Sequence, residues 1–268
     1  MTETLNVLSL FAGIGGLELG LERAGMKTVG QVEIDEWCRG ILAKHWPDVP
    51  QHDDVLTAIE WWTSIERPPV HVVCGGFPCQ PFSFAGLQLG RDDPRWMWPA
   101  MADVIRAVRP LYVLVENVAA LVRDAGAFGT VLRDLHALGF DAEWATLRAS
   151  DFGAPHRRER VYLVAHATRD HGGDPNESSA PWAWGQLEPR GGRGEHGRGD
   201  WLPEPDVGRV AHGVPRRVVY KPLRALGNAV VPRIPEHIGR LIVAAQEPHS
   251  SGKEESLAHS KNWPSYTT

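Results

Sequence analysis

The sequence predicts an α/β protein built on a doubly wound, mostly parallel sheet. Short apolar runs alternate with amphipathic stretches along the first 166 residues, which is typical of strands joined by helical crossovers. Glycine and proline end these segments, as where Gly13, Gly15 and Gly16 follow the apolar run 5–11. A chain of 268 residues is long enough for one such domain and a smaller appendage.

The individual elements follow from apolar periodicity and from the residues that end each run. Strands are expected over 5–11, 28–32, 70–73, 111–115, 140–147 and 161–165. Helices are expected over 17–24, 37–46, 94–108, 128–138 and 234–245. Residues 168–208 are dense in Gly, Pro, Arg and Trp without periodicity, which predicts an irregular insert. The polar residues 247–268 are expected to form a loose, flexible tail.

The composition is that of an ordinary soluble protein, with 43% hydrophobic and 23% charged residues. We find no signal peptide and no apolar run long enough to span a bilayer, so a cytoplasmic protein is expected. Cys38, Cys74 and Cys79 form no CxxC pair, which argues against a disulfide framework and against a metal site. A thiol stays reduced and nucleophilic in a cytoplasm.

Charge is distributed unevenly along the chain. The net charge is −5, yet residues 186–240 carry 10 Lys and Arg against 6 Asp and Glu, whereas residues 1–185 carry 16 against 24. A basic segment after an acidic body favours a polyanionic partner. A solvated Arg-rich loop explains the same charges equally well.

The segment from Gly75 to Ser83, GGFPCQPFS, places a cysteine just past a predicted strand. Open α/β sheets bind ligands at the carboxyl ends of their strands. Pro78 fixes the backbone before Cys79, and the two glycines let a substrate approach closely. The pattern indicates a thiolate nucleophile on a rigid turn, although a free cysteine is commonly just a small buried hydrophobe.

A second set of residues is suited to a nucleoside. The turn Phe11–Gly16, FAGIGG, follows the first strand but lacks the dinucleotide spacing of glycines. Glu33 ends the second strand, where an acid accepts both hydroxyls of a ribose, and Asp54 is placed to accept from an adenine amino group. S-adenosylmethionine is a nucleoside without pyrophosphate that suits this set. Each acid, taken singly, is more often a helix cap or a solvated turn.

Glu116 and a cluster of arginines complete the candidate chemistry. Glu116 ends a predicted strand, and glutamate is rarely buried without a partner or a task. A protonated glutamate donates to a ring nitrogen while its other oxygen accepts from an exocyclic amine. Arg157, Arg158 and Arg160 precede the strand 161–165, where surface salt bridges are the simpler explanation.

Together these motifs resemble those of the DNA (cytosine-5) methyltransferases, in that family's order. Phe11–Gly16 is similar to the first S-adenosylmethionine motif, Gly75–Ser83 to the Pro-Cys loop, and Glu116-Asn117-Val118 to the Glu-Asn-Val motif. Arg158 and Arg160 match the arginines of the Gln-x-Arg-x-Arg motif, and Leu226–Pro232, LGNAVVP, matches the last motif. The resemblance implies a Rossmann-like methyltransferase sheet over 1–166 and 222–246. It also implies a small irregular target-recognition region over 167–221.

The resemblance implies methyl transfer from S-adenosylmethionine to C5 of a cytosine flipped out of duplex DNA. Cys79 would add to C6, Glu116 would bind the base edge, Arg160 would orient the base, and Arg158 would support both. Phe77, Pro78, Gln80 and Ser83 are expected at the substrate, with the loop 80–95 closing over DNA. The implied cofactor contacts are Phe11, Gly13, Glu33, Ile34, Asp54, Val55, Pro78, Trp98, Asn228 and Val230.

Several positions depart from the family pattern. His156 replaces the usual Gln, and Trp98 stands where an aliphatic residue is usual. The family's ninth motif is not evident before the last motif, so target recognition is expected to depend on few side chains. Candidates for groove and phosphate contacts are Trp182, Trp184, Arg190, Arg193 and Arg198.

Two other functions stay open. An RNA cytosine-5 methyltransferase is disfavoured because its Cys-Phe-Thr-x-x-Tyr signature is absent. A catalytically silent DNA-binding relative is disfavoured because every expected reacting residue is present. The expected enzyme is a monomer without a metal, in a restriction-modification system or as an orphan or phage-borne methyltransferase.

Overall fold

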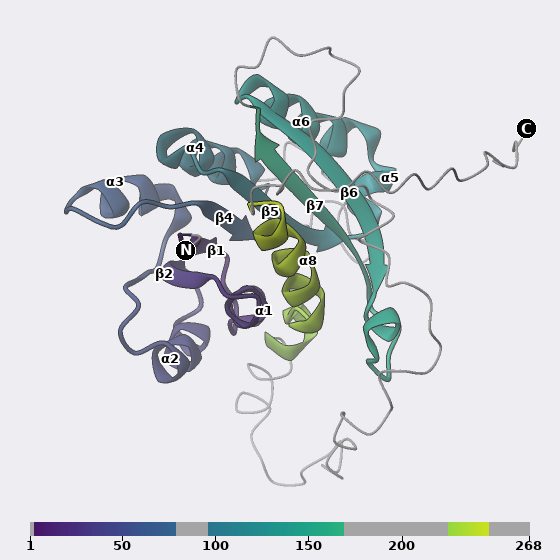
Figure 1. Ribbon diagram of the computed structural model, residues 1–268, viewed down its shortest axis with the longest axis horizontal. Helices are drawn as coiled ribbons and strands as arrows, with labels where there is room; N and C mark the ends of the chain where they lie inside the picture. The colour runs from purple at the N-terminus through teal and green to yellow at the C-terminus, as the bar shows by residue number, and fades with distance from the viewer. Residues whose placement is uncertain (1–2, 79–95, 169–224, 247–268) are drawn as a thin grey trace, which may run out of the picture.

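A seven-stranded sheet forms the centre of the molecule in the computed structural model, which describes residues 3–78, 96–168 and 225–246. The strands are β1 (Asn6–Leu10), β2 (Lys27–Val32), β3 (Gln51–His52), β4 (Val72–Gly75), β5 (Tyr112–Val118), β6 (Phe140–Arg148) and β7 (Glu159–Ala167). Their order across the sheet is β3-β2-β1-β4-β5-β7-β6. Figure 1 shows the sheet between helices on its two faces. The predicted doubly wound α/β fold is confirmed.

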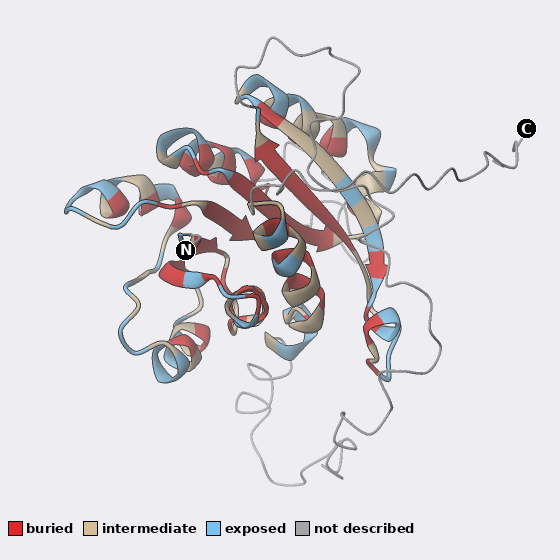
Figure 2. Ribbon diagram, viewed as in Figure 1, coloured by how far each residue is buried: buried red, intermediate tan, exposed pale blue. Residues whose placement is uncertain are grey.

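The helices cover the two faces of this sheet (Figure 1). They are α1 (Gly16–Arg23), α2 (Glu36–His45), α3 (Ala58–Thr63), α4 (Trp98–Val108), α5 (Ala120–Arg123), α6 (Ala125–Ala137) and α8 (Arg233–Ala244), with the short 3-10 helices η1 (Val55–Thr57) and η4 (Ala149–Phe152). One hydrophobic cluster joins the sheet to α3, α4 and α6, and a second joins it to α1 and α8. The strands at the centre are accordingly buried on both faces (Figure 2).

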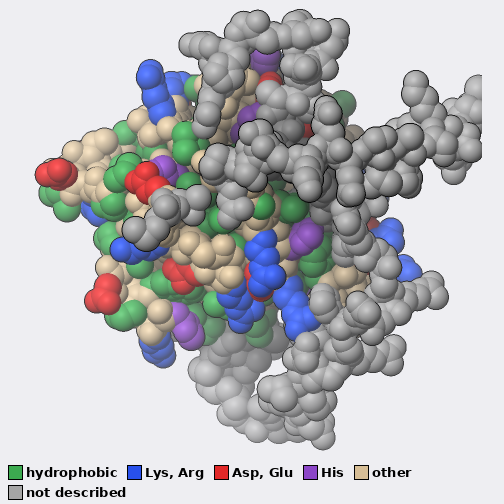
Figure 3. All heavy atoms as spheres, in the orientation of Figure 1, with side chains coloured by type: hydrophobic (Ala, Val, Ile, Leu, Met, Phe, Trp, Pro, Cys, Tyr) green, Lys and Arg blue, Asp and Glu red, His purple; other side chains and the backbone are tan. Residues whose placement is uncertain are grey.

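The helix α8 returns from a distant part of the sequence to pack beside α1. Its apolar side chains, such as Ile234 and Ile238, are buried against the second cluster. Its outer face carries Glu236, which pairs with Arg240 at 2.6 Å and with Arg23 at 4.0 Å. Figure 3 shows basic side chains gathered over this part of the surface with an acidic side chain among them. We therefore interpret these arginines as partners of Glu236.

The strand directions decide which ends of the strands meet. β1 pairs in parallel with β2 and β4, and β4 pairs in parallel with β5. β7 runs antiparallel to both β5 and β6. The carboxyl ends of β1, β2, β4 and β5 therefore share one edge, where open α/β sheets bind their ligands.

Several predicted boundaries were wrong. The strand predicted over 111–115, ending in Glu116, is longer in the structure: β5 continues to Val118 because β7 pairs with it past the last residue of β4. β4 lies two residues later than predicted and ends at Gly75. The helix predicted from 94 begins at Trp98. The two-residue strand β3 and the short helices α3 and α5 were not predicted, because so few residues show no clear periodicity.

The described residues contain neither a membrane-spanning helix nor a cluster of metal-binding side chains. Residues 3–78, 96–168 and 225–246 contain no helix that is long and apolar enough to cross a bilayer. In the same ranges no three His, Cys, Asp or Glu side chains gather in a way that would hold a metal ion. The predicted target-recognition region, apart from Ala167 and Thr168, and the predicted tail lie outside the described residues.

Candidate active site

The glycine turn after β1 is closed by the acid at the end of β2. The carboxylate of Glu33 accepts the backbone N–H of Gly13 at 2.7 Å through Oε2 and that of Asp35 at 2.8 Å through Oε1. Phe11, with φ 54°, holds a left-handed backbone that a bulky residue rarely adopts. Such strain concentrates at ligand sites, and here it turns the chain over the edge of the sheet.

Glu33 is suited to a ribose even though both of its oxygens already accept a hydrogen bond. Each carboxylate oxygen has a second lone pair, so each is able to accept a ribose hydroxyl as well. Ile34, the next residue, is 78% exposed, which leaves an apolar side chain beside the acid for a flat ring to cover. Asp54 caps η1, its Oδ1 accepting from Leu56 N at 2.9 Å, and Val55 is buried behind it. The structure therefore gives Asp54 a structural task, while its cofactor contact stays a prediction.

The last motif meets the glycine turn from the far end of the sequence. A Cβ on Gly16 would lie only 2.5 Å from the backbone oxygen of Val230, so the two backbones are in direct contact. Residues 225–228 form a helical turn that ends at the exposed Asn228. The predicted cofactor residues Phe11, Gly13, Asn228 and Val230 therefore belong to one region.

Asn117 holds the turn that leads to the Pro-Cys loop. Its side-chain Nδ2 donates to the carbonyl of Phe77 at 3.1 Å, and its Oδ1 accepts from Val118 N at 2.9 Å. Asn117 is buried, so this amide is an internal support. This role of Asn117 was not predicted; the signal for it was an amide residue in an otherwise apolar strand, where buried polar groups require partners.

Phe77 is also fixed through its ring. The ring packs against Trp96 at 5.3 Å and Trp98 at 5.6 Å between centroids. The Trp98 indole is fully buried and donates to Asp134 Oδ2 at 2.9 Å, so its side chain supports Phe77 from within the core. Its predicted cofactor contact stays a prediction. Pro78, which follows Phe77, is exposed at the edge of the sheet.

Glu116 lies in β5 directly beside this turn. A Cβ on Gly76 would lie 3.1 Å from Glu116 Oε2, which shows that the carboxyl faces the start of the Pro-Cys loop. The residue is 7% exposed, and burial raises the pKa of this carboxyl to about 7 although Arg160 and Arg158 act against the rise. At neutral pH Glu116 is therefore protonated in a large fraction of molecules.

One oxygen of Glu116 is left open to a donor. The Nε of Arg160 lies 3.2 Å from Oε1, within ion-pair distance. The N–H does not point along that line, and Oε1 accepts no hydrogen bond from the described residues. A buried carboxyl oxygen in this state is costly unless an incoming group completes it. An exocyclic amine would do so.

The two arginines of the motif differ in what they contact. Arg160, which pairs with Val118 across β5 and β7, is the one whose guanidinium reaches Glu116. Arg158 donates instead from Nη1 to the carbonyl of Gly227 at 2.7 Å. Burial and the charge of Arg160 lower the pKa of Arg158. Its charge acts on Glu116, and its predicted support of that residue stays a prediction.

Other predicted site residues lie outside the described residues. These are the nucleophile Cys79, the substrate residues Gln80 and Ser83, and the candidates for target recognition Trp182, Trp184, Arg190, Arg193 and Arg198. The residue before Cys79 is described, and it follows a turn that Asn117 and Gly76 place against Glu116. The roles of the residues outside the described ranges stay predictions from the sequence.

Comparison with known proteins places this chain in a family. The model of the C-5 cytosine-specific DNA methylases matches residues 5–179, more than half of the chain. The chain belongs to that family. It is 38% identical over 169 residues to the type II methyltransferase M.NaeI of Lentzea aerocolonigenes, which covers 61% of this chain and 40% of the relative. It is 36% identical over 160 residues to M.NgoBI of Neisseria gonorrhoeae, covering 59% and 49%.

Two solved methyltransferase structures have a similar fold. A protein described as a DNA modification methyltransferase encoded within a prophage (E. coli) superposes with a TM-score of 0.52 and 29% identity, over 61% of this chain and 47% of the other. The Dnmt2 methyltransferase of S. pombe gives the same TM-score at 22% identity, over 68% and 52%, and supports the fold alone. The chain spans about half the length, or less, of the curated relatives named above.

Proposed function

We propose that this chain transfers a methyl group from S-adenosylmethionine to C5 of cytosine in duplex DNA, as a type II modification enzyme or an orphan relative. Membership of the C-5 cytosine-specific DNA methylase family supports the reaction class. A DNA substrate would place the enzyme in the cytoplasm of a bacterial host. The target is a short specific sequence, read by the predicted target-recognition region over 167–221.

The observation that carries the proposal is the environment of Glu116. A buried glutamate with a pKa of about 7 is able to keep its proton at neutral pH. A protonated carboxyl offers one donor and one acceptor on one edge, which is the pattern that matches N3 and the 4-amino group of cytosine. Its open Oε1 and the nearby Gly76, which has no side chain to block the approach, support a base at this position.

S-adenosylmethionine, when bound, supplies an electrophilic methyl group. Glu33 would hold the ribose hydroxyls, the exposed Ile34 would cover the adenine, and the Asn228–Val230 segment would close the site from the other side. The two hydrogen bonds from Gly13 and Asp35 hold the Glu33 carboxylate in place before a ligand arrives. A carboxylate fixed in this way loses little freedom on binding.

The chain's own groups divide the reaction between them. The target cytosine is turned out of the duplex, since its C5–C6 bond is out of reach in the stack. The Cys79 thiolate forms a bond to C6, the electrons of the C5–C6 double bond move to C5, and Glu116 stabilises the charge on the ring by hydrogen bonding N3. C5 then takes the methyl group, whose bond to the sulfonium sulfur breaks to leave S-adenosylhomocysteine. Loss of the C5 proton and breaking of the S–C6 bond release 5-methylcytosine.

The experiment that tests this proposal is transfer of labelled methyl groups to unmethylated duplex DNA, with transfer RNA assayed alongside and the 5-methylcytosine positions sequenced. We expect label in DNA at one recurring short sequence. The Cys79→Ser variant is expected to bind DNA but to transfer no methyl group. Label in RNA alone would replace this proposal with an RNA methyltransferase. Full activity of the Cys79→Ser variant would contradict the nucleophile.

A further inference from the structure

Arg158 connects two parts of the chain that the proposed reaction brings together. It lies just before β7, and its Nη1 donates to the carbonyl of Gly227 at 2.7 Å, a contact across 69 residues of sequence. Gly227 immediately precedes Asn228, which is expected to contact the cofactor. The hydrogen bond from a charged guanidinium to a carbonyl is among the stronger ones in proteins.

The backbone that carries Arg158 is itself held. The N–H of Ala149 lies within hydrogen-bond distance of the carbonyls of both Arg157 and Arg158, at 3.1 Å each. Arg148 pairs with Glu159 in the ladder between β6 and β7. The side chain of Arg158 therefore projects from a fixed position towards the segment 225–228.

That segment has a second anchor at its other end. Val230 lies against Gly16, whose absent side chain leaves room for the Val230 carbonyl. Between Gly227 and Val230 the chain has Asn228 and Ala229, and Ala229 N donates to Leu226 O at 3.2 Å. Asn228 therefore lies between two contacts of its own segment: Gly227 with Arg158, and Val230 with Gly16.

Arg158 also belongs to the electrostatic environment of the base site. The charges that act on it come from Arg160, Glu116 and Tyr162, all on the paired strands β5 and β7. Its own charge acts in return on Glu116 and Tyr162. The charge of Arg158 therefore acts on Glu116, the residue proposed to bind the base. The same side chain holds the backbone beside Asn228, the residue expected to contact the cofactor.

We infer that Arg158 is a positioning residue for the cofactor site: its guanidinium holds the Gly227 carbonyl and so places Asn228, which links cofactor binding to the base site. This inference rests on the proposed function. A residue that acted solely on the base would leave cofactor affinity unchanged when removed. Arg158 instead affects both cofactor affinity and the rate of methyl transfer.

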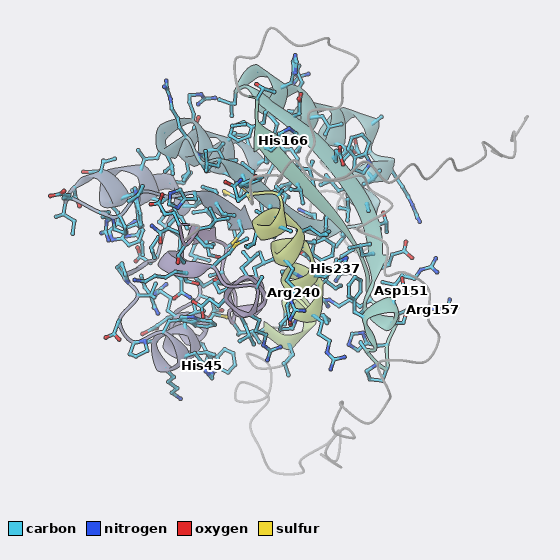
Figure 4. The ribbon with its side chains drawn as sticks, in the orientation of Figure 1. His45, Asp151, Arg157, His166, His237 and Arg240 are labelled. Carbon is cyan, nitrogen blue, oxygen red and sulfur yellow. The ribbon has the colours of Figure 1, made fainter. Side chains whose placement is uncertain are left out.

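The test is calorimetric titration of the full chain with S-adenosylhomocysteine in the absence of DNA. We expect Arg158→Ala to weaken binding about tenfold, the amount of one hydrogen bond to a charged group. Arg158→Lys, which keeps the charge and one donor, should recover part of this loss. The matched control is Arg157→Ala, since Arg157 is the preceding residue and is exposed; Figure 4 labels it towards the right of the ribbon. The control should bind as the unmodified protein does.

The outcomes separate this inference from the proposed function. Unchanged affinity in Arg158→Ala, with methyl transfer lowered, would overturn the inference and leave the proposed function standing. An unmodified protein that does not bind S-adenosylhomocysteine would overturn the proposed function instead. If Arg158→Ala does not fold by circular dichroism, Arg158→Lys decides: a measurable loss of affinity relative to Arg157→Ala supports the inference, and equal affinity contradicts it.

Discussion

The side-chain amide of Asn117 donates to the carbonyl of Phe77, two residues before the predicted nucleophile Cys79. Asn117 is in β5 and Phe77 follows β4, so this bond joins the neighbouring strands at the edge where their carboxyl ends meet. Glu116, the residue before Asn117, faces Gly76 in the same turn. This contact therefore helps to set the position of Glu116 relative to the start of the Pro-Cys loop.

Replacing Asn117 by Ala should lower the rate of methyl transfer about 100-fold, because a nucleophile misplaced by about an ångström loses its reactive geometry. The free energy of unfolding should fall by about 1–3 kcal/mol, since the Phe77 carbonyl loses its buried donor. Single-turnover methyl transfer and denaturant unfolding measure the two effects.

The matched control is Asn6→Ala. Asn6 Nδ2 also donates to a backbone carbonyl, that of Pro69 at 2.8 Å, but at the amino end of β1. This variant should retain its rate of methyl transfer. Equal rates for Asn117→Ala and Asn6→Ala would show that the Phe77 contact does not position the loop.

Glu116→Gln should remove the alkaline decline of activity. Burial raises the pKa of Glu116 to about 7, so the protonated form that donates to the base is lost as the pH rises above that value. Because Glu116 loses its proton, the unmodified enzyme should lose activity about tenfold per pH unit at pH values well above 7. The amide of Gln does not titrate, so the variant should be slower, by about 100-fold, and should show no such decline.

The measurement is kcat/KM for methyl transfer between pH 6 and 9, compared as the ratio of the two proteins at each pH. The ratio removes the contribution of Cys79 ionisation, which both proteins share. A ratio that does not change with pH would contradict protonated Glu116 as the active form.

Glu18 predicts a pH-dependent stability. This residue of α1 is fully buried, and the side chains of Ser9 and Cys74 interact with its carboxyl group. Burial raises its pKa from 4.5 to about 7, with smaller effects of Glu22 and Glu33 in the same direction. At pH values between these two pKa values, Glu18 is ionised in the unfolded chain but protonated in the folded chain. The free energy of unfolding therefore falls as the pH rises.

Glu18→Gln should therefore be more stable than the unmodified protein at pH 8, by about 3 kcal/mol, and about equal at pH 4. Urea unfolding at the two pH values measures the difference. Glu60→Gln, at an exposed position of α3, is the control and should show no such dependence. A Glu18→Gln gain that is the same at both pH values would indicate a packing effect rather than removal of a buried charge.

Gly16→Ala should damage the contact between the glycine turn and the last motif. Its methyl group would lie 2.5 Å from the backbone oxygen of Val230, so one of the two backbones has to move. We expect a loss of about 1–3 kcal/mol in stability and weaker binding of S-adenosylhomocysteine. Thermal unfolding with and without that ligand measures both.

Gly40→Ala is the control for this substitution. Gly40 is in the helix α2, and a methyl group there meets nothing within 4 Å. The change should leave ligand binding unaltered and raise stability by about 1 kcal/mol at most, because alanine favours the helix. Normal ligand binding by Gly16→Ala would mean that the Val230 segment takes no part in the cofactor site.

The sequence was sufficient to predict six of the seven strands, while the chemistry at the edge of the sheet stays a prediction. Apolar runs identified β1 and β2, since burial on both faces requires continuous apolar strands. The amphipathic stretch between two glycine turns identified α1. Glu33 and Glu116 were found because an acid next to a buried strand is unusual. Family motifs supplied Arg158 and Arg160.

What could not be predicted depends on contacts between residues far apart in the sequence. The extension of β5 through Glu116 requires β7 as a partner, and nothing in the local sequence indicates that pairing. The contacts of Asn117 with Phe77 and of Arg158 with Gly227 likewise depend on tertiary structure. The division of tasks between the two arginines follows from their positions relative to β5, which a motif does not encode.

The reversed direction of β7 has a consequence for how the site is assembled. In a parallel sheet, only the carboxyl end of each strand lies at the ligand-binding edge. Adding residues to that edge from a further parallel strand therefore requires another crossover connection. β7 runs the other way, and the chain therefore passes the ligand edge as it enters the strand. Arg158 and Arg160 reach Glu116 and Gly227 from this incoming segment, and the site gains two cations from a strand whose far end lies on the opposite side of the sheet.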